Sequence, residues 1–281
     1  MTSDSRGTAS TFAQLGTVTK YSFLNYLRAR RFLVMVLIVS IINLALTAAV
    51  AYTRSAAFLD STPLGFYGAW WGSFIDISIL LTVVFFGGDA ISGEFQNKTG
   101  YFLAPNPVRR STLYVGKYLA AFIASTLILV LFLAFTLANG LYYGMGVPTQ
   151  FAESFLFAWL YLLTALGVTF MFSSLFKTTS ISILITVLLF LFVFTVIDEL
   201  STILLKIEPW FSITYAEGII ANILTVPFPL HYVAAITSGP GARFSFPTYN
   251  ATVPEGLEIM AVYLIVCSLL GLLIFERKEF N

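Results

Sequence analysis

Residues 87–117, GGDAISGEFQNKTGYFLAPNPVRRSTLYVGK, form a polar island between two long apolar runs. A plain connector between two membrane spans would need only a few turn residues, and this segment is much longer. Its charged residues are Asp89, Glu94, Lys98, Arg109, Arg110 and Lys117. We therefore expect this segment to form local structure of its own.

Residues 90–99 have the spacing of a short amphipathic helix, with Ile91, Phe95 and Lys98 on one side. Gly100 can end this helix as a C-terminal cap. The Ala-Pro-Asn-Pro sequence that follows favours extended or turn backbone. A short helix displayed on the cytoplasmic side of a membrane would suit docking to a soluble partner.

The order of these pieces resembles the ATP-binding-cassette (ABC) type-two permeases, which are membrane subunits of exporter-type ABC transporters. The shared pattern is an acidic residue in a short helix, a Thr-Gly pair, a Leu-x-x-x-Pro-x-x-Arg turn and a Gly-Lys pair opening the next span. The matching positions are Glu94, Thr99, Gly100, Leu103, Pro107, Arg110, Gly116 and Lys117. The looser similarity of pattern extends over all 281 residues.

The resemblance implies a coupling helix that seats in a separate ATPase. The expected ATPase-coupling residues are Ile91, Glu94, Phe95, Lys98, Thr99 and Gly100. The expected turn and anchor residues of the loop are Pro107, Arg109, Arg110 and Lys117. The resemblance also implies two copies of the ATPase, which would bind ATP and Mg²⁺, and pairing of the chain with itself or with a second permease. It further implies export across the plasma membrane of a prokaryotic cell.

The composition indicates a polytopic membrane protein. The chain is 58% hydrophobic and 10% charged, with a mean hydropathy of +0.88, whereas soluble domains carry about 25% charged residues. A net charge of +1 argues against a nucleic-acid binder. A single cysteine, Cys267, and a single histidine, His231, argue against a disulfide and against zinc or haem chemistry, so no metal site is expected.

No catalytic residues are predicted in this chain. The sequence has no Gly-x-x-x-x-Gly-Lys-Ser/Thr phosphate loop, no nucleophile elbow and no metal-ligand helix motif. We therefore expect a transport subunit that is not itself an enzyme and holds no cofactor.

The apolar runs predict an all-α fold with six transmembrane helices in one domain, residues 1–281. An N-terminal amphipathic helix, 11–31, is expected to lie on the inner leaflet and to contact lipid, or else to be a cytosolic cap on the first span. The predicted spans are 32–52, 73 to 86 or 90, the run after Lys117 to 138, 153–176, 181–197 and 257–275.

Two outer segments stand out. Residues 54–72 are predicted to be a loop whose Tyr67, Trp70 and Trp71 form an aromatic belt at the membrane surface. Residues 198–256 are rich in proline and contain two apolar stretches, 201–207 and 214–226, too short to cross. We predict short outer helices at these two stretches.

The distribution of cations predicts the orientation. With the N-terminus inside, twelve Lys and Arg residues fall in inner segments, and Arg54, Lys206 and Arg243 fall outside. This is a clear positive-inside bias, so both termini are predicted to be cytoplasmic.

Several candidate residues have plain structural alternatives. Asp76 lies inside a predicted span, so it either faces the translocation path or dimer seam or reaches the outer interface. Glu94 and Lys98 are spaced as an ordinary helix-stabilising pair, worth about 0.3–0.5 kcal/mol. Arg109 and Arg110 can serve as lipid-headgroup anchors, and Lys117 can extend its ammonium back to the membrane surface.

A competing function is a secondary transporter or channel that works without an ATPase. Such proteins usually need paired charges within the membrane or broken half-helices in repeated halves. Asp76 is the one ionisable residue well inside a predicted span, and the two halves of the chain differ in their long loops. A membrane-embedded enzyme is a third alternative, weakened by the lack of clustered His or acidic residues in the spans.

Overall fold

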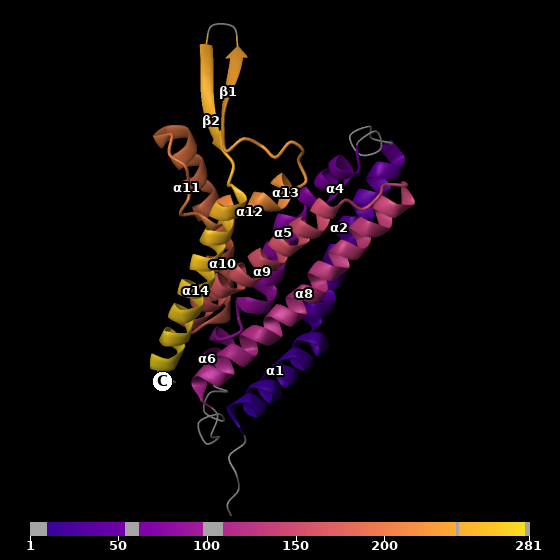
Figure 1. Cartoon of the computed structure of the whole chain (residues 1–281). Helices are drawn as coiled ribbons and strands as arrows, with labels where there is room; N and C mark the ends of the chain where they lie inside the picture. Colours follow the sequence, from indigo (N-terminus) through magenta and orange to yellow (C-terminus); the bar gives the residue numbers. More distant parts are fainter. Residues whose placement is uncertain (1–9, 54–61, 98–108, 240–241, 279–281) are drawn as a thin grey trace, which may run out of the picture.

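The computed structural model describes residues 10–53, 62–97, 109–239 and 242–278, with backbone alone for 234–239 and 242–246. These residues form a bundle of long helices with a β-hairpin projecting from one end (Figure 1). The C-terminus and the short helix α6 lie at the opposite end of the bundle. The predicted all-α membrane fold is confirmed, and the hairpin is an addition to it.

Six helical stretches in the described part of the chain are long and apolar enough to cross a membrane, as predicted. They are Arg30–Thr53, Pro63–Gln96, Arg110–Tyr142, Thr149–Leu175, Thr179–Leu205 and Val253–Arg277. The corresponding elements are α2 (Arg30–Thr53), α4 (Pro63–Gly72) with α5 (Ile75–Gly87) and α6 (Ser92–Gln96), α8 (Arg110–Tyr142), α9 (Thr149–Leu175), the helix from α10 (Thr179–Leu188) through α11 (Thr195–Leu200), and α14 (Val253–Arg277).

The N-terminal helix α1, Thr11–Arg28, is separate from α2. Ser10 caps its first turn by accepting a hydrogen bond from the backbone N–H of Ala13 at 3.3 Å. The extended backbone of Ala29, with φ −72° and ψ 139°, then breaks the helix. Figure 1 shows α1 lying alongside the N-terminal half of α8, so one of its faces has a protein partner.

Close approach of α1 to α8 depends on Gly116. A Cβ at this position would lie 2.6 Å from Cγ1 of Val18, so any side chain there would push the two helices apart. The glycine that the sequence pattern places before Lys117 therefore has a packing role between helices.

The predicted loop and aromatic belt at 54–72 are wrong for the described residues. Residues 63–72 form α4, whose N-terminus is set by Thr62 as cap and Pro63 in the first turn. Tyr67, Trp70 and Trp71 have no exposed surface. The rings of Tyr67 and Trp71 contact aromatic side chains of α8 and α9, so these residues build the protein interior.

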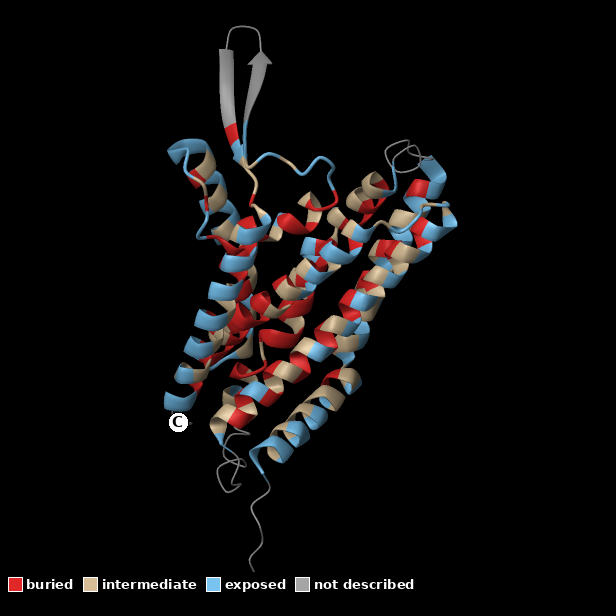
Figure 2. Cartoon of the chain, in the orientation of Figure 1, coloured by how far each residue is buried: buried red, intermediate tan, exposed pale blue. Residues whose placement is uncertain are grey.

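The core of the bundle lies around α5 and α9. Figure 2 shows the buried residues gathered along the centre of the bundle, with exposed residues on the outer faces of α8 and α14. Helix α9 packs against α14 over much of its length. Gly271 of α14 permits this approach, because a Cβ there would meet the backbone of Met171 at 3.0 Å.

The fifth span is longer than predicted. It runs without a break from Thr179 to Leu205 and includes two π-helical stretches, Leu189–Phe194 and Ser201–Leu205. The stretch 201–207 was predicted as a separate outer helix, which is wrong. Its residues continue the span until Lys206 adopts a left-handed conformation with φ 53°.

The segment between the fifth and sixth spans contains two short helices and a hairpin. Helices α12 (Ile213–Glu217) and α13 (Ile219–Asn222) confirm the short helix predicted at 214–226. Strands β1 (Tyr232–Gly239) and β2 (Ala242–Tyr249) pair antiparallel, with Tyr232 opposite Tyr249. The hairpin was not predicted.

Candidate functional site

The short helix α6 follows α5 at the end of the bundle away from the hairpin (Figure 1). It corresponds to the predicted helix at 90–99 but is shorter, covering Ser92–Gln96. Four predicted site residues, Lys98, Thr99, Gly100 and Pro107, lie outside the described residues. The structure describes the remaining predicted residues, and their contacts are given below.

The N-terminus of α6 is fixed by a residue of α9. Ser173 is fully buried, and its Oγ accepts hydrogen bonds from the backbone N–H groups of Ile91 and Ser92, each at 3.0 Å. The first N–H groups of a helix have no partner within that helix. Because Ile91 has no side-chain oxygen to cap the helix, Ser173 performs that role from 82 positions away in the sequence.

Lys117 ties α6 to α8. Its ammonium donates a hydrogen bond to the backbone oxygen of Ala90 at 3.0 Å and forms an ion pair with Oε1 of Glu94. The two side chains are only 16% and 17% exposed. Lys117 therefore reaches back toward the loop, and its acceptors there belong to the protein.

The C-terminal end of α6 is tied to the start of the fifth span. Oε1 of Gln96 accepts hydrogen bonds from the backbone N–H of Thr179 at 2.8 Å and from its hydroxyl at 2.7 Å. The amide of Gln96 thus caps α10 in place of a residue next to it in the sequence.

Phe95 joins α6 to the C-terminal end of α14. Its ring contacts Phe275 edge-on at 6.1 Å, and the ammonium of Lys278 lies 4.4 Å from its centre. Lys278 also donates to the last backbone oxygens of α9, on Ser174 and Leu175, at 2.8 and 3.0 Å. Desolvation, followed by the nearby charge of Lys177, lowers the pKa of Lys278 from 10.5 to about 8.

Arg110 binds the same end of α14. Its guanidinium donates to the backbone oxygens of Glu276 at 3.1 Å and Lys278 at 2.6 Å. Cations at a helix C-terminus satisfy carbonyls that have no partner within the helix. Arg110 thus anchors α8 to α14, whereas Arg109 occupies the N-cap position of α8 with an exposed side chain that makes no capping hydrogen bond.

Arg31 and Asp89 form a second ion pair, between the start of α2 and the turn before α6. One guanidinium nitrogen lies 2.5 Å from each carboxylate oxygen of Asp89. Beside this pair, the phenol of Tyr26 donates to the backbone oxygen of Phe86 at 2.9 Å. Burial raises the pKa of Tyr26 well above its usual range, so this phenol stays protonated as a donor.

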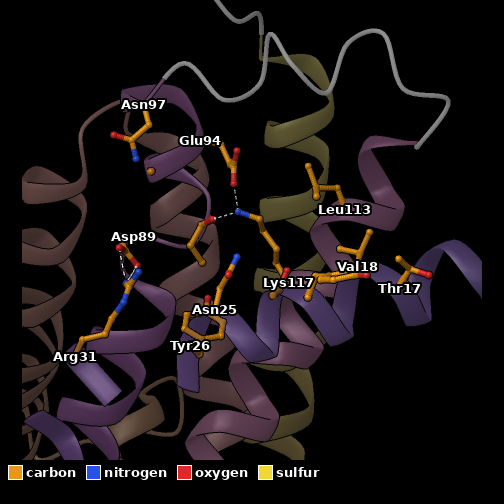
Figure 3. A pocket seen from close by; sticks show the side chains of 14 residues that line it. Thr17, Val18, Asn25, Tyr26, Arg31, Asp89, Glu94, Asn97, Leu113 and Lys117 are labelled. Carbon is orange, nitrogen blue, oxygen red and sulfur yellow. Dashed lines mark hydrogen bonds and ion pairs between the residues drawn. The ribbon is translucent and has the colours of Figure 1, made fainter. Parts of the chain in front are cut away.

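A cavity of about 700 Å³ separates α1 from α6. Figure 3 shows the two ion pairs on its wall, with Lys117 directed at Glu94 and Arg31 at Asp89. The remaining lining side chains come from α1, the end of α6 and α8, and include Thr17, Val18, Tyr21, Asn25, Asn97 and Leu113. The wall of the cavity is about equally polar and apolar, and its ion pairs are those of Lys117 with Glu94 and of Arg31 with Asp89.

Asp76 lies in the first turn of α5, at the other end of the bundle, and is exposed. Its carboxyl group is hydrogen-bonded to that of Glu217 at the end of α12. The phenol of Tyr161 donates to Oε2 of Glu217 at 2.9 Å. Desolvation, followed by the charge of Asp76, raises the pKa of Glu217 well above its usual range, so Glu217 holds a proton more tightly than a free glutamate does.

Sequence reasoning missed Ser173, Gln96, Lys278 and the pair of Arg31 with Asp89. Each makes its contact with a residue more than 50 positions away. A buried serine or a terminal lysine gives no pattern that would identify a partner at that distance. Of these contacts, the sequence indicated only the one made by Asp89, because an acidic residue at the end of an apolar span calls for a cationic partner.

A comparison with protein families finds a match over most of the chain. The family model described as "ABC-2 family transporter protein" matches residues 17–280, which is nearly the whole chain. Among curated proteins, none matches the chain.

Proposed function

Since the chain belongs to the ABC-2 transporter family and is a multi-pass permease of an ABC transporter, we propose that it forms an export pathway driven by a separate ATPase. ATP and Mg²⁺ would be bound by that ATPase, present in two copies. The end of the bundle with α6 and both chain termini would face the cytoplasm.

One observation carries this proposal: the attachment of α6 to several spans at once. Lys117 links it to α8, Ser173 links it to α9, and Gln96 links it to α10. Phe95 adds a contact with α14. A push on α6 by a bound partner would therefore be transmitted to four long helices, which is what a coupling helix requires.

The cavity between α1 and α6 suits the reception of a partner. Its wall combines paired charges with the neutral polar side chains of Asn25 and Asn97, a surface that water or a protein loop can occupy. We propose that a segment of the ATPase enters it, so that α1 and α6 move together when the ATPases close. The spans would then rock and open a path toward the outside.

The surface of the bundle is consistent with pairing to a second permease. Asp76 is exposed near the outer end of α5, and a charged side chain facing lipid costs about 2.5–3.5 kcal/mol at the centre of a bilayer and less toward the interface. A dimer seam or an aqueous path would remove that cost. We propose that Asp76 and Glu217 line one of these two.

The docking proposal can be tested by filling the cavity. Thr17 lines it from the exposed face of α1, whereas Phe12 is 86% exposed on the same helix and does not line it. Thr17→Trp should reduce co-purification of the ATPase and ATP hydrolysis by the assembly, while Phe12→Trp should leave both unchanged. Equal behaviour of the two variants would reject the docking site. Flux driven by an ion gradient through the chain alone would favour a secondary transporter.

A further inference from the structure

Three segments of the outer region meet at a cluster of two carboxylates and an imidazole. Glu208 lies between the fifth span and α12, His231 directly precedes β1, and Glu255 lies in the first turn of α14. One ligand atom from each residue lies within 4.8 Å of the other two. All three side chains are partly exposed, at 24% for Glu208 and 37% for the other two.

The hydrogen bonds of His231 determine which nitrogen is free. Nδ1 lies 3.0 Å from the backbone oxygen of Asn250, which can only accept, so Nδ1 carries a hydrogen. Nε2 then faces Oε2 of Glu208 at 3.2 Å. A neutral imidazole would turn a lone pair toward this carboxylate oxygen, so the arrangement requires a cation or a second proton between them.

The spacing of His231 and Glu208 agrees with metal coordination. Zinc bonds of 2.0–2.2 Å at tetrahedral angles place neighbouring ligand atoms roughly 3.3–3.5 Å apart. The 3.2 Å separation of Nε2 from Oε2 of Glu208 is close to this distance. Oε2 of Glu255 lies 3.5 Å from Nδ1, and the three ligand atoms lie within 4.8 Å of one another, so a shift of the Glu255 carboxylate toward Nε2 would complete the set. Donation from Nδ1 to a backbone oxygen is also how metal-binding histidines are usually oriented.

The two carboxylates are oriented by residues outside the cluster. The phenol of Tyr215 donates to Oε1 of Glu208 at 2.9 Å. The backbone N–H of Thr252 donates to Oε2 of Glu255 at 2.8 Å, as part of the cap of α14. Both contacts hold the carboxylates in place for a ligand and leave oxygen lone pairs for it.

We propose that Glu208, His231 and Glu255 bind a divalent transition-metal ion, with zinc as the first choice. A mixed nitrogen and oxygen ligand set favours zinc, whereas Mg²⁺ and Ca²⁺ prefer oxygen ligands alone. A dication would neutralise the two carboxylates. With three protein ligands, the ion keeps a position for water or another ligand.

The ion would brace the base of the hairpin. His231 is opposite Asn250 there, and the N–H of Asn250 donates to the backbone oxygen of His231 at 2.8 Å. Coordination would fasten this base to the start of α14 on one side and to the end of the fifth span on the other. The orientation of the hairpin would then depend on the metal.

The test uses the full-length chain, purified in detergent with a tag that contains no histidine and freed of metal by a chelator. Calorimetric titration with ZnCl₂ should give one Zn²⁺ per chain and a higher thermal midpoint. Because His231 is the single histidine, imidazole nitrogen coupling in the pulsed EPR spectrum of bound Cu²⁺ can come only from this residue.

The variants separate a metal site from a structural hydrogen-bond cluster. His231→Ala and the isosteric Glu208→Gln should weaken zinc binding about 100-fold, and Tyr215→Phe should weaken it about tenfold. Glu258→Gln, an exposed carboxylate on the same helix as Glu255, is the matched control and should bind zinc as the wild type does. Thermal midpoints measured in chelator show whether each variant is folded.

Three results would overturn the proposal. They are a folded wild type that binds no stoichiometric zinc, a Cu²⁺ spectrum without imidazole coupling, and unchanged zinc affinity in both His231→Ala and Glu208→Gln. In each case the cluster would be an imidazolium held by two carboxylates.

Discussion

The ion pair of Lys117 with Glu94 should determine how tightly α6 is held against the bundle. Replacing Lys117 with Met removes the donor to Glu94 and to the backbone oxygen of Ala90. Loss of one partner of a fully buried pair costs about 3–5 kcal/mol, and exposed pairs contribute about 0–1 kcal/mol. Because these side chains keep about a sixth of their exposure, we expect Lys117→Met to weaken the attachment of α6 to the bundle by about 2 kcal/mol.

A buried thiol reports the opening of α6. Ser92 is fully buried in α6, so Ser92→Cys should react with a maleimide only when the helix detaches. At 1.4 kcal/mol for each factor of ten, a loss of about 2 kcal/mol should raise the labelling rate about 30-fold in the Lys117→Met background. The native Cys267 is buried in α14 and labels only when the bundle opens, so it is an internal control.

A double-mutant cycle isolates the pair. Glu94→Gln together with Lys117→Met removes both charges and should label more slowly than Lys117→Met alone, because no uncompensated carboxylate is left. Lys20→Met, which removes an exposed cation from α1, should leave the labelling rate of Ser92→Cys unchanged. If Lys117→Met labels at the wild-type rate, or if Cys267 reacts as fast as the introduced thiol, the pair does not act as a local latch and the reasoning fails.

Three further predictions concern other contacts. Ser173→Ala should destabilise the attachment of α6 by about 1–3 kcal/mol, because two buried N–H groups lose their acceptor, and the same labelling assay measures this. Gly116→Ala should separate α1 from α8 and cost about 1–3 kcal/mol in detergent unfolding, with Val18→Ala restoring part of the loss. Burial raises the pKa of Glu217, so the native state keeps a proton that the unfolded chain loses near pH 4.5. Stability should therefore fall as pH rises through the native pKa, and Glu217→Gln should weaken this dependence.

The transmembrane helices could be predicted because their signal is local. An uncharged apolar run long enough to cross a bilayer is visible in the sequence without knowledge of its neighbours. The loop helix α6 was predicted for the same reason, from apolar spacing and polar flanks. The pairing of Lys117 with Glu94 was not, because the two residues are 23 positions apart and sequence spacing rules concern neighbours within one helical turn.

The buried aromatic residues and the hairpin show what local rules miss. Trp70 and Trp71 lie next to an apolar run, a position that predicts an aromatic belt at the membrane surface. The packing of α4 against α8 and α9 buries them instead. The strands β1 and β2 lie in a segment rich in proline, and Pro247 within β2 weakens the strand pattern. The Gly-Pro-Gly sequence at 239–241 was the available signal for a hairpin.

The central claim is that a separate ATPase docks beside α6. Asn97 is exposed at the end of α6 and lines the cavity, so Asn97→Cys places a thiol at the proposed interface for a photoactivatable crosslinker. We expect it to capture a soluble protein that contains a phosphate loop and hydrolyses ATP, with a yield that changes when ATP is added. Val147→Cys, exposed at the other end of the bundle, should capture none. Absence of such an ATPase at position 97, or equal capture at both positions, would contradict the claim.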